Sequence, residues 1–300
     1  MRIVKMMYGL GNQLFEYAFY RKLEHLYGED VFVDVEWYDA SDRHPWDVYQ
    51  LDMVGLFPKK IARNEYCVRD YYIRNNNISE KEFDEIRPEL GVRVVDLFNE
   101  APYGKNQEKI WLLDNVYYYG FYQNIDTVDI GIEYVRKEIE FPKWKSKDFN
   151  EIKDRIVSDD KSVSIHMRMD NHVKEPECYD VVCSDRYFRK SIETIREYLP
   201  DAYFYVFSND IIAARRRLAD VKNTCFVELE EAHYGIEDME LMSLCRHNII
   251  SNSTFSWWAA VLNSNYDKKV IIPDVFDVRM DFIKREDVNL YYPEWIRISG

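Results

Sequence analysis

The sequence contains no long hydrophobic run. None of its apolar stretches approaches the about 20 residues that a helix needs to cross a membrane. No charged segment followed by an apolar one stands at the N-terminus, so no secretory leader is expected. These absences predict a cytoplasmic protein, and a peripheral association with the inner face of the membrane is compatible with them.

Cysteine is scarce, and basic residues are outnumbered. The five cysteines are an odd number without Cys-x-x-Cys spacing, so neither a disulfide framework nor a zinc site is expected. The 54 acidic residues against 40 basic ones give a net charge of −14. This balance argues against a nucleic-acid-binding protein, which would need a basic face. An anionic small ligand would require a local basic pocket.

The N-terminal residues predict a strand, a turn and a helix. Residues 2–7 read as a strand, and a helix is expected after Gly9 and Gly11, with Asn12 as its N-cap. The glycines would let a ligand approach the backbone. The complete Gly-x-Gly-x-x-Gly fingerprint is absent, because leucine stands where the third glycine would be. A nicotinamide-type dinucleotide site is therefore not predicted.

The second half of the chain has a regular rhythm. A basic stretch with a proline, residues 141–147, is interpreted as an interdomain linker. After it, strands and helices alternate, which predicts a parallel sheet with right-handed crossovers. We therefore expect an α/β protein of two domains, residues 1–148 and residues 149–300. Residues 40–110 give no clear pattern.

A hydroxyl-rich turn lies between a short apolar strand and a helix near the C-terminus. The turn carries four hydroxyls and one amide, on Ser251, Asn252, Ser253, Thr254 and Ser256. From Phe255 onward the spacing of apolar residues is helical. A helix N-terminus offers unpaired N–H groups and the positive end of its dipole, so this turn predicts a phosphate site. Ordinary N-capping is the alternative, although it needs only one such residue.

Three more polar residues stand where predicted strands end. His166 and Arg168 close the strand 162–167, and Ser208 follows the strand 203–207. Ligands of parallel sheets bind at the carboxyl ends of the strands, so we expect these residues and the hydroxyl-rich turn to meet at one edge. The alternative is structural: a hydrogen-bonded histidine beside an arginine in a salt bridge.

Five blocks of sequence follow one another in a recognisable order, namely residues 9–18, 120–123, 163–168, 207–208 and 238–258. They resemble the α-1,2-fucosyltransferases of glycosyltransferase family 11. The resemblance implies a GT-B-like fold, with two Rossmann-like domains whose mostly parallel sheets face a cleft. It also implies an inverting transfer from GDP-fucose to a hydroxyl, commonly of galactose, in an oligosaccharide, a glycolipid or a bacterial surface polysaccharide. No metal or other cofactor is expected, in line with the absence of an Asp-x-Asp triplet.

One block departs from the family pattern. Where the family typically has His-x-Arg-Arg-Gly-Asp, residues 166–171 read His-Met-Arg-Met-Asp-Asn. Arg168 keeps the first arginine, which the resemblance implies to bind the β-phosphate, and Met169 replaces the second. Two alternatives stay open: a GDP-sugar-binding protein with weak or no transfer, and a transferase that uses another GDP-deoxysugar.

Pattern and resemblance together assign the site residues. The catalytic residues are expected to be Arg168, His166 and Asn12. The donor-binding residues are expected to be Gly9, Gly11, Ser208, Asp238, Ser253, Thr254, Phe255 and Ser256. Asp238 would accept N–H groups of guanine, unless it only complements a helix dipole. No general base is evident; the candidates are Asp34, Asp170, Glu16 and a water relay.

Overall fold

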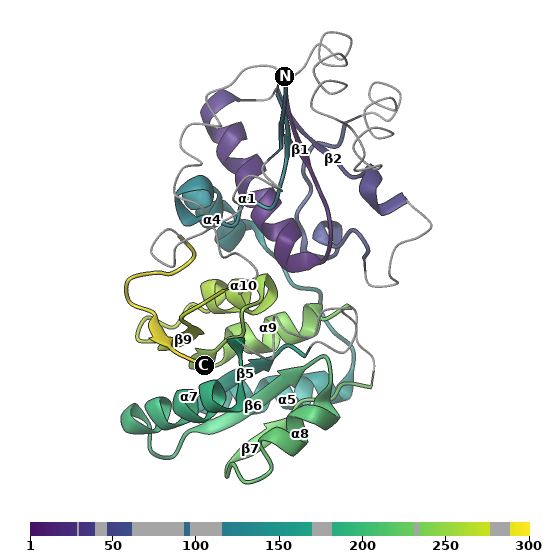
Figure 1. Cartoon of the computed structure of the whole chain (residues 1–300). Coiled ribbons are helices and arrows are strands. Elements are labelled where there is room, and N and C mark those ends of the chain that lie inside the picture. The colour runs from purple at the N-terminus through teal and green to yellow at the C-terminus, as the bar shows by residue number, and fades with distance from the viewer. Residues whose placement is uncertain are drawn as a thin grey trace. The chain divides into compact units, whose positions relative to one another are not determined.

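The computed structural model describes most of the chain, namely residues 1–28, 30–39, 47–61, 93–96, 116–169, 182–230, 234–276 and 289–300. The chain forms two compact units (Figure 1). The first comprises Met1–Glu140 and Glu286–Leu290, and the second comprises Phe141–Arg285 and Tyr291–Gly300. The division falls before the stretch 141–147. The predicted boundary after residue 148 lies inside the first helix of the second unit.

The first unit is built on a parallel sheet of four described strands in the order β2-β1-β4-β3. The strands are β1 (Arg2–Lys5), β2 (Val31–Asp34), β3 (Arg93–Asp96) and β4 (Val116–Tyr119). The helices are α1 (Leu10–Tyr27) and α4 (Ile125–Glu138), with the short 3-10 helices η1 (Glu36–Asp39) and η2 (Leu51–Val54). All four residues of β1 are buried, as is usual for the centre of a parallel sheet. The backbone N–H of Ile125, the first residue of α4, donates a hydrogen bond to the carbonyl of Asn289, so the second part of this unit contacts the start of α4.

The start of α1 differs from the prediction. Gly9 is the N-cap residue, and the helix begins at Leu10. The expectation that Asn12 would be the cap is therefore wrong, because the carbonyl of Gly9 already accepts the N–H groups of Asn12 (3.0 Å) and Gln13 (3.2 Å). The helix ends at Gly28, which has a φ of 74° and whose N–H donates to the carbonyl of Glu24.

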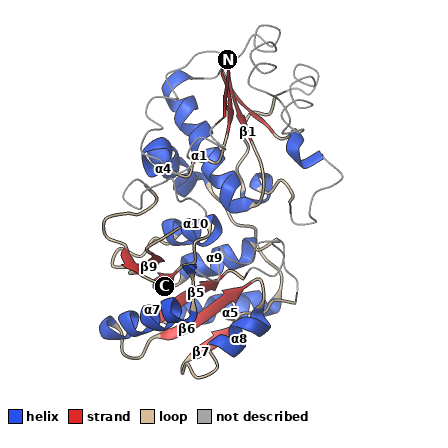
Figure 2. Ribbon diagram, in the orientation of Figure 1, coloured by secondary structure: helices blue, strands red, loops and turns tan. Residues whose placement is uncertain are grey.

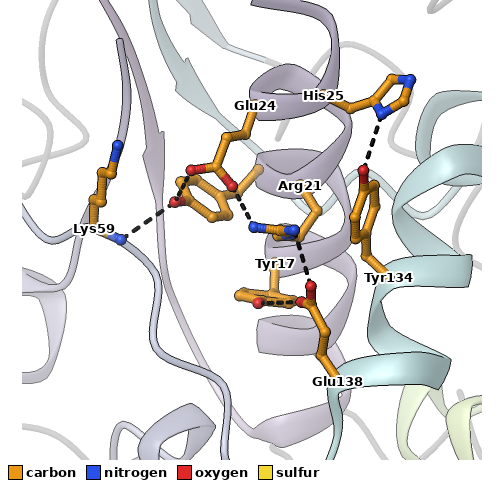
Figure 3. A network of polar contacts seen from close by, with 8 residues as sticks. Tyr17, Arg21, Glu24, His25, Lys59, Tyr134 and Glu138 are labelled. Carbon is orange, nitrogen blue, oxygen red and sulfur yellow. Dashed lines mark hydrogen bonds and ion pairs between the residues drawn. The ribbon is translucent and has the colours of Figure 1, made fainter. Parts of the chain in front are cut away.

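Polar side chains join α1 to α4 (Figure 3). Glu138 accepts hydrogen bonds from the hydroxyl of Tyr17 (2.8 Å) and from Nη2 of Arg21 (2.9 Å). One turn further along α1, Nδ1 of His25 lies 3.0 Å from the hydroxyl of Tyr134. Burial, together with the hydrogen bond to Glu138, raises the pKa of Tyr17. The network fixes one helix against the other along the side of the unit.

The second unit has a six-stranded parallel sheet in the order β10-β9-β8-β5-β6-β7. The strands are β5 (Ser162–Met167), β6 (Tyr203–Ser208), β7 (Thr224–Phe226), β8 (His247–Ile249), β9 (Val270–Pro273) and β10 (Ile296–Ile298). The helices are α5 (Lys147–Ser158), α7 (Asp185–Tyr198), α8 (Ile211–Arg217), α9 (Ile236–Leu244) and α10 (Thr254–Leu262). The predicted parallel sheet is confirmed, and β10 is an additional edge strand that the sequence did not predict.

Helices cover both faces of this sheet (Figure 2). Val163, Ile165 and Met167 pack on one face in a core that includes residues of α7 and α8. On the other face, Nδ2 of Asn248 donates to the hydroxyl of Ser164 (2.8 Å) and to the carbonyl of Met242 in α9 (2.8 Å). Successive residues of β5 thus alternate between the two faces of the sheet. None of the described helices combines the length and the apolar character needed to span a membrane.

Candidate active site

The strand order of the second unit reverses next to β5. From β5 the chain adds β6 and β7 on one side, and then crosses over to β8, β9 and β10 on the other. Such a switch point leaves a crevice at the carboxyl ends of the two strands that flank it, here β5 and β8. The residues at the end of β5 are His166 to Arg168, and those that follow β8 belong to the hydroxyl-rich turn.

Ser251 joins these two strand ends. Its buried hydroxyl donates to the carbonyl of His166 (2.5 Å) and accepts from the backbone N–H of Arg168 (3.1 Å). The serine therefore holds the backbone around His166 and Arg168 against the hydroxyl-rich turn. The sequence predicts that Ser251 belongs to a phosphate-binding turn. In the structure its hydroxyl instead stabilises the backbone at the end of β5.

The hydroxyl-rich turn divides into buried and accessible residues. Ser256 is buried, and its hydroxyl donates to the carbonyl of Ser253 (3.3 Å). Ser253, Thr254 and Phe255 are partly exposed. Ser253 is the N-cap residue of α10, yet its side chain makes no capping hydrogen bond. The Ser253 hydroxyl therefore does not act as an ordinary side-chain cap. The positive end of the α10 dipole stays available to an anion.

The His166 side chain lies beside this helix N-terminus. It is 6% exposed, and its ring centroid is 5.6 Å from that of Phe255. Within the described residues its Nδ1 has no hydrogen-bond partner. Burial, aided by the nearby positive charge of Arg168, lowers the pKa of His166 to about 3. The imidazole is therefore neutral at neutral pH, with a buried nitrogen that a ligand could engage.

Asn209 holds the segment after β5 from the other side. Its Oδ1 accepts from the N–H of Met169 (2.8 Å), and its Nδ2 donates to the carbonyl of the same residue (3.0 Å). The side chain of Met169 is buried in the apolar core, and its sulfur lies 3.4 Å from Nη1 of Arg217. The position at which the family pattern has a second arginine thus points into the core of this unit.

Ser208 and Asp238, two other predicted donor-binding residues, differ in the hydrogen bonds that their side chains make. The hydroxyl of Ser208 donates to the carbonyl of Met167 (2.7 Å) and accepts from the N–H of Asp210 (3.1 Å), so it secures the end of β6. Asp238, in the first turn of α9, is half-buried, and no hydrogen bond to its carboxyl is among the influences on its pKa. Burial, together with the neighbouring Glu237, raises the pKa of Asp238 to about 7.

The starts of α9 and α10 lie close together. Gly235, the N-cap residue of α9, has a φ of 82°. A Cβ built on it would be 3.3 Å from Cζ of Phe255, the second residue of α10. Glycine thus meets both demands, a left-handed backbone and a close approach. This contact brings the helix that carries Asp238 next to the candidate anion site.

The predicted residues of the N-terminal block lie in the first unit. Gly9 and Gly11 are at the start of α1, and Asn12 is in its first turn. Oδ1 of Asn12 accepts from Nε2 of Gln123 (3.0 Å), which follows β4. Sequence reasoning assigned Gln123 no role, although it closes one of the resembling blocks. Its position in the loop that follows β4 was the available signal.

Two of the candidates for the general base, Asp34 and Glu16, are unfavourably placed. Asp34 accepts from the Tyr117 hydroxyl (2.5 Å) and from the N–H of Glu36 (2.9 Å), so both oxygens are engaged. Glu16 is fully buried inside the first unit, and burial raises its pKa well above the usual range. The same burial leaves Glu16 no access to an acceptor hydroxyl, which a general base has to reach. Asp170 lies outside the described residues. Among the described residues, no group of three or more His, Cys, Asp and Glu could hold a metal ion.

Comparison with known proteins agrees with this architecture. The model of the family described as Glycosyl transferase family 11 matches residues 3–299. An α-1,2-colitosyltransferase of Escherichia coli is 27% identical, over 99% of this chain and 98% of that protein. The O-antigen biosynthesis glycosyltransferase WbnK of Escherichia coli is 26% identical, over 97% of this chain and 98% of that protein. The mouse galactoside α-(1,2)-fucosyltransferase 2 is 29% identical, over 46% of this chain and 40% of that protein.

A solved structure shows the same fold. It is the crystal structure of the α-1,6-fucosyltransferase NodZ soaked with GDP-fucose. Its TM-score is 0.50 at 12% sequence identity, over 87% of this chain and 91% of that chain. At this identity the likeness establishes the fold alone, a GT-B-like arrangement of α/β units with parallel sheets. The family match extends over nearly the whole chain. The chain therefore belongs to glycosyltransferase family 11.

Proposed function

We propose that this glycosyltransferase moves L-fucose from GDP-fucose to a sugar hydroxyl, with inversion at the anomeric carbon. The acceptor is O2 of a galactose in an oligosaccharide, a glycolipid or a bacterial surface polysaccharide. One observation carries the proposal: Arg168, His166 and the start of α10 meet at the switch point of the second sheet. Relatives named for α-1,2 linkages and for a galactoside acceptor support the linkage and the acceptor.

The diphosphate of the donor binds at the N-terminus of α10. The backbone N–H groups of Phe255 and Ser256 make no hydrogen bond within the described chain, and the hydroxyl of Ser253 is not used as a cap. These donors and the helix dipole favour phosphate oxygens. Arg168 supplies a permanent positive charge, and its planar guanidinium can bind two oxygens at once.

Two neighbouring side chains complete donor recognition. The neutral His166 can give or accept one hydrogen bond at its buried Nδ1. Asp238 on the adjacent helix accepts N–H groups of guanine. Its raised pKa fits this role, because a half-buried carboxyl without partners gains most from donors that a ligand brings.

The transfer itself exchanges one bond at C1 of fucose for another. The bond from C1 to the β-phosphate oxygen breaks, and its electron pair leaves with GDP. The acceptor oxygen attacks from the opposite face and loses its proton to a base or through water. The developing charge on the diphosphate is stabilised by Arg168 and by the start of α10, without a metal ion. EDTA should accordingly leave the rate within about twofold of the control.

A second donor calls for a parallel test. The similar Escherichia coli protein is named an α-1,2-colitosyltransferase, and it aligns with almost the full length of this chain. The alternative function is thus transfer of another GDP-linked deoxysugar, such as colitose, by the same residues. A protein that binds GDP-sugars without turnover is the remaining alternative.

The decisive experiment is a donor panel with lactose as acceptor, read by product mass and by the NMR coupling at the new linkage. The chain is given GDP-fucose, GDP-colitose or UDP-galactose. We expect one deoxysugar to be added, in α linkage, from a GDP donor only. Thermal melts with GDP, UDP and ADP run alongside. Stabilisation by GDP without transfer from any donor would favour the binding protein. Equal stabilisation by the three nucleotides would contradict the role of Asp238.

A further inference from the structure

Three aromatic rings gather at the carboxyl edge of the first sheet. Tyr8 follows β1, Trp37 lies in η1 after β2, and Phe121 follows β4. Since β2, β1 and β4 are neighbouring parallel strands, these residues come together. The ring centroid of Tyr8 is 4.8 Å from that of Trp37 and 5.3 Å from that of Phe121. Trp37 is buried at 6% exposure, whereas Tyr8 is 37% exposed. Tyr8 therefore presents an aromatic surface on a packed base.

The backbone of Tyr8 is held in an unusual conformation. Its φ is 61°, in the left-handed region that bulky residues rarely adopt. Its carbonyl accepts two hydrogen bonds, from Nε2 of the buried Gln13 (2.7 Å) and from the hydroxyl of Tyr38 (3.0 Å). The fold thus maintains an unfavourable backbone with the ring partly in solvent, and burial of the ring does not account for it.

Polar groups follow Tyr8 and Phe121 closely in the sequence, at the start of α1 and after β4. Gln123 is 3% exposed; its Nε2 donates to Oδ1 of Asn12, and its Oε1 has no partner among the described residues. A buried carbonyl oxygen without a donor is costly, and a ligand hydroxyl would satisfy it. Between Tyr8 and Asn12 stands Gly9, and a Cβ added there would meet no atom within 4 Å. The edge therefore combines an exposed ring, open space and an amide pair.

We propose that Tyr8, Phe121, Asn12 and Gln123 form a subsite for a neutral pyranose ring of the acceptor. The assignment rests on the proposed function, which requires a sugar acceptor. The C–H face of a pyranose packs on an aromatic ring, and its hydroxyls pair with amides that both donate and accept. A ring with neutral polar neighbours suits an uncharged sugar, whereas the diphosphate has a separate cationic site in the second unit.

The test replaces the ring and keeps the backbone conformation. Asparagine tolerates positive φ, so Tyr8→Asn should leave the melting temperature within about 2 °C of the wild type. We expect the KM for lactose to rise at least about tenfold, while the KM for GDP-fucose stays within about twofold. Tyr8→Phe, which keeps the ring, should recover most of the acceptor affinity. The matched control is Tyr266→Asn, because Tyr266 is fully exposed in the second unit.

A binding measurement separates this subsite from the proposed function. Saturation-transfer NMR with methyl β-galactoside should show contact to one face of the sugar in the wild type and loss of contact in Tyr8→Asn. That result without any turnover of GDP-fucose would retain the subsite and refute the proposed transfer. Normal transfer with an unchanged KM for lactose in Tyr8→Asn would refute the subsite alone. Loss of contacts to GMP in place of the sugar would also overturn it, since Tyr8 would then stack on a nucleotide.

A second variant tests the polar half of the subsite. Gln123→Met has a similar length, and it removes both the unpartnered oxygen and the donor to Asn12. We expect the KM for lactose to rise by about tenfold with a smaller change in GDP affinity. The opposite pattern, weaker GDP binding with an unchanged lactose KM, would show that this amide serves the donor and would overturn its assignment.

Discussion

Gly131 of α4 lies directly against the carbonyl of Ala18 in α1. A Cβ added to Gly131 would stand 1.7 Å from that oxygen, so the two helix backbones approach as closely as a glycine allows. Polar pairs also join these two helices, among them Tyr17 with Glu138 and His25 with Tyr134 (Figure 3). Small residues permit such approach, and any side chain must push the helices apart.

Gly131→Ala should therefore destabilise the first unit by at least about 2 kcal/mol, because backbone atoms cannot yield as a flexible side chain can. The measurement is a denaturant titration followed by circular dichroism. Gly9→Ala is the control, since its Cβ meets nothing within 4 Å and its φ is −77°. We expect its stability within about 0.5 kcal/mol of the wild type. An equally stable Gly131→Ala would contradict the helix contact.

Ser251 and Ser253 should respond differently to the same substitution. Ser251→Ala leaves the carbonyl of His166 and the N–H of Arg168 without their buried partner, so we expect a loss of about 1–3 kcal/mol in folding free energy. Ser253→Ala removes a partly exposed hydroxyl that caps nothing. Its stability should hold while GDP binds more weakly. Thermal melts with and without GDP distinguish the two effects, and identical behaviour of both variants would contradict the division of the turn.

Two groups of the second unit should give opposite dependences of stability on pH. The folded-state pKa of His166 is lowered to about 3, so its contribution is full above the unfolded pKa of about 6.5 and is lost as pH falls toward 3. The pKa of Asp238 is raised to about 7, so its contribution is full below the unfolded value of about 3.9 and is lost as pH rises toward 7. Between about pH 4 and 6.5 the two largely cancel.

Single variants should reveal how each group changes the free energy of unfolding with pH. Relative to the wild type, the free energy of unfolding of Asp238→Asn should gain a rise with pH of up to about 1.4 kcal/mol per unit between about pH 4 and 6.5, because the opposing contribution of Asp238 is removed. Relative to the wild type, that of His166→Gln should gain a fall with pH of a similar or smaller size, because the contribution of His166 is removed. Urea titrations across this pH range provide the measurement. Parallel pH profiles for the two variants would refute the assignment of either group.

Arg168→Lys keeps a positive charge but loses the planar fork. Two-point contact with phosphate oxygens becomes one-point contact, which matters most as charge develops on the leaving diphosphate. We expect kcat to fall by roughly a hundredfold, about 3 kcal/mol, with a smaller change in GDP affinity. Full activity of this variant with GDP-fucose would place the main cation elsewhere. Exposed Lys222→Arg serves as the control for a change of cation.

Met169→Arg should not recover a more complete family pattern. The Met169 side chain is buried in the apolar core and lies 3.4 Å from the guanidinium of Arg217. A second guanidinium there would be buried beside a like charge, so we expect a drop of several degrees in the melting temperature and no gain in rate. Met169→Leu, which preserves volume, is the control. A stable and more active Met169→Arg would contradict the burial of this position.

The sheet of the second unit and its site edge were predictable from the sequence. Apolar strands alternating with helices specify a parallel sheet, and polar residues at strand ends then meet at one edge, as Ser251, Arg168 and Ser208 do. Which hydroxyls are taken up by structural hydrogen bonds was not predictable. That depends on hydrogen bonds between residues far apart in sequence, such as the bond from Ser251 to the carbonyl of His166.

The first unit shows a second limit. Asparagine has a high capping preference, so the sequence favours Asn12 as the cap of α1, yet tertiary hydrogen bonds around Gln13 accompany a helix that starts one turn earlier, after Gly9. The conformation of Tyr8 is not predictable either, because a left-handed tyrosine has no sequence signature. Its position results from strands β2, β1 and β4, which are far apart in the chain.

The late segment Glu286–Leu290 has a consequence for how the protein is made. It belongs to the first unit, where the carbonyl of Asn289 accepts the N–H of Ile125 and Leu290 is fully buried. Synthesis delivers the N-terminus first, so most of this unit leaves the ribosome long before the residues that complete it. The first unit therefore cannot finish folding until nearly all of the second has been translated. Neither unit can be excised as one continuous piece of sequence, and truncation after residue 285 would damage the first unit and remove β10 from the second.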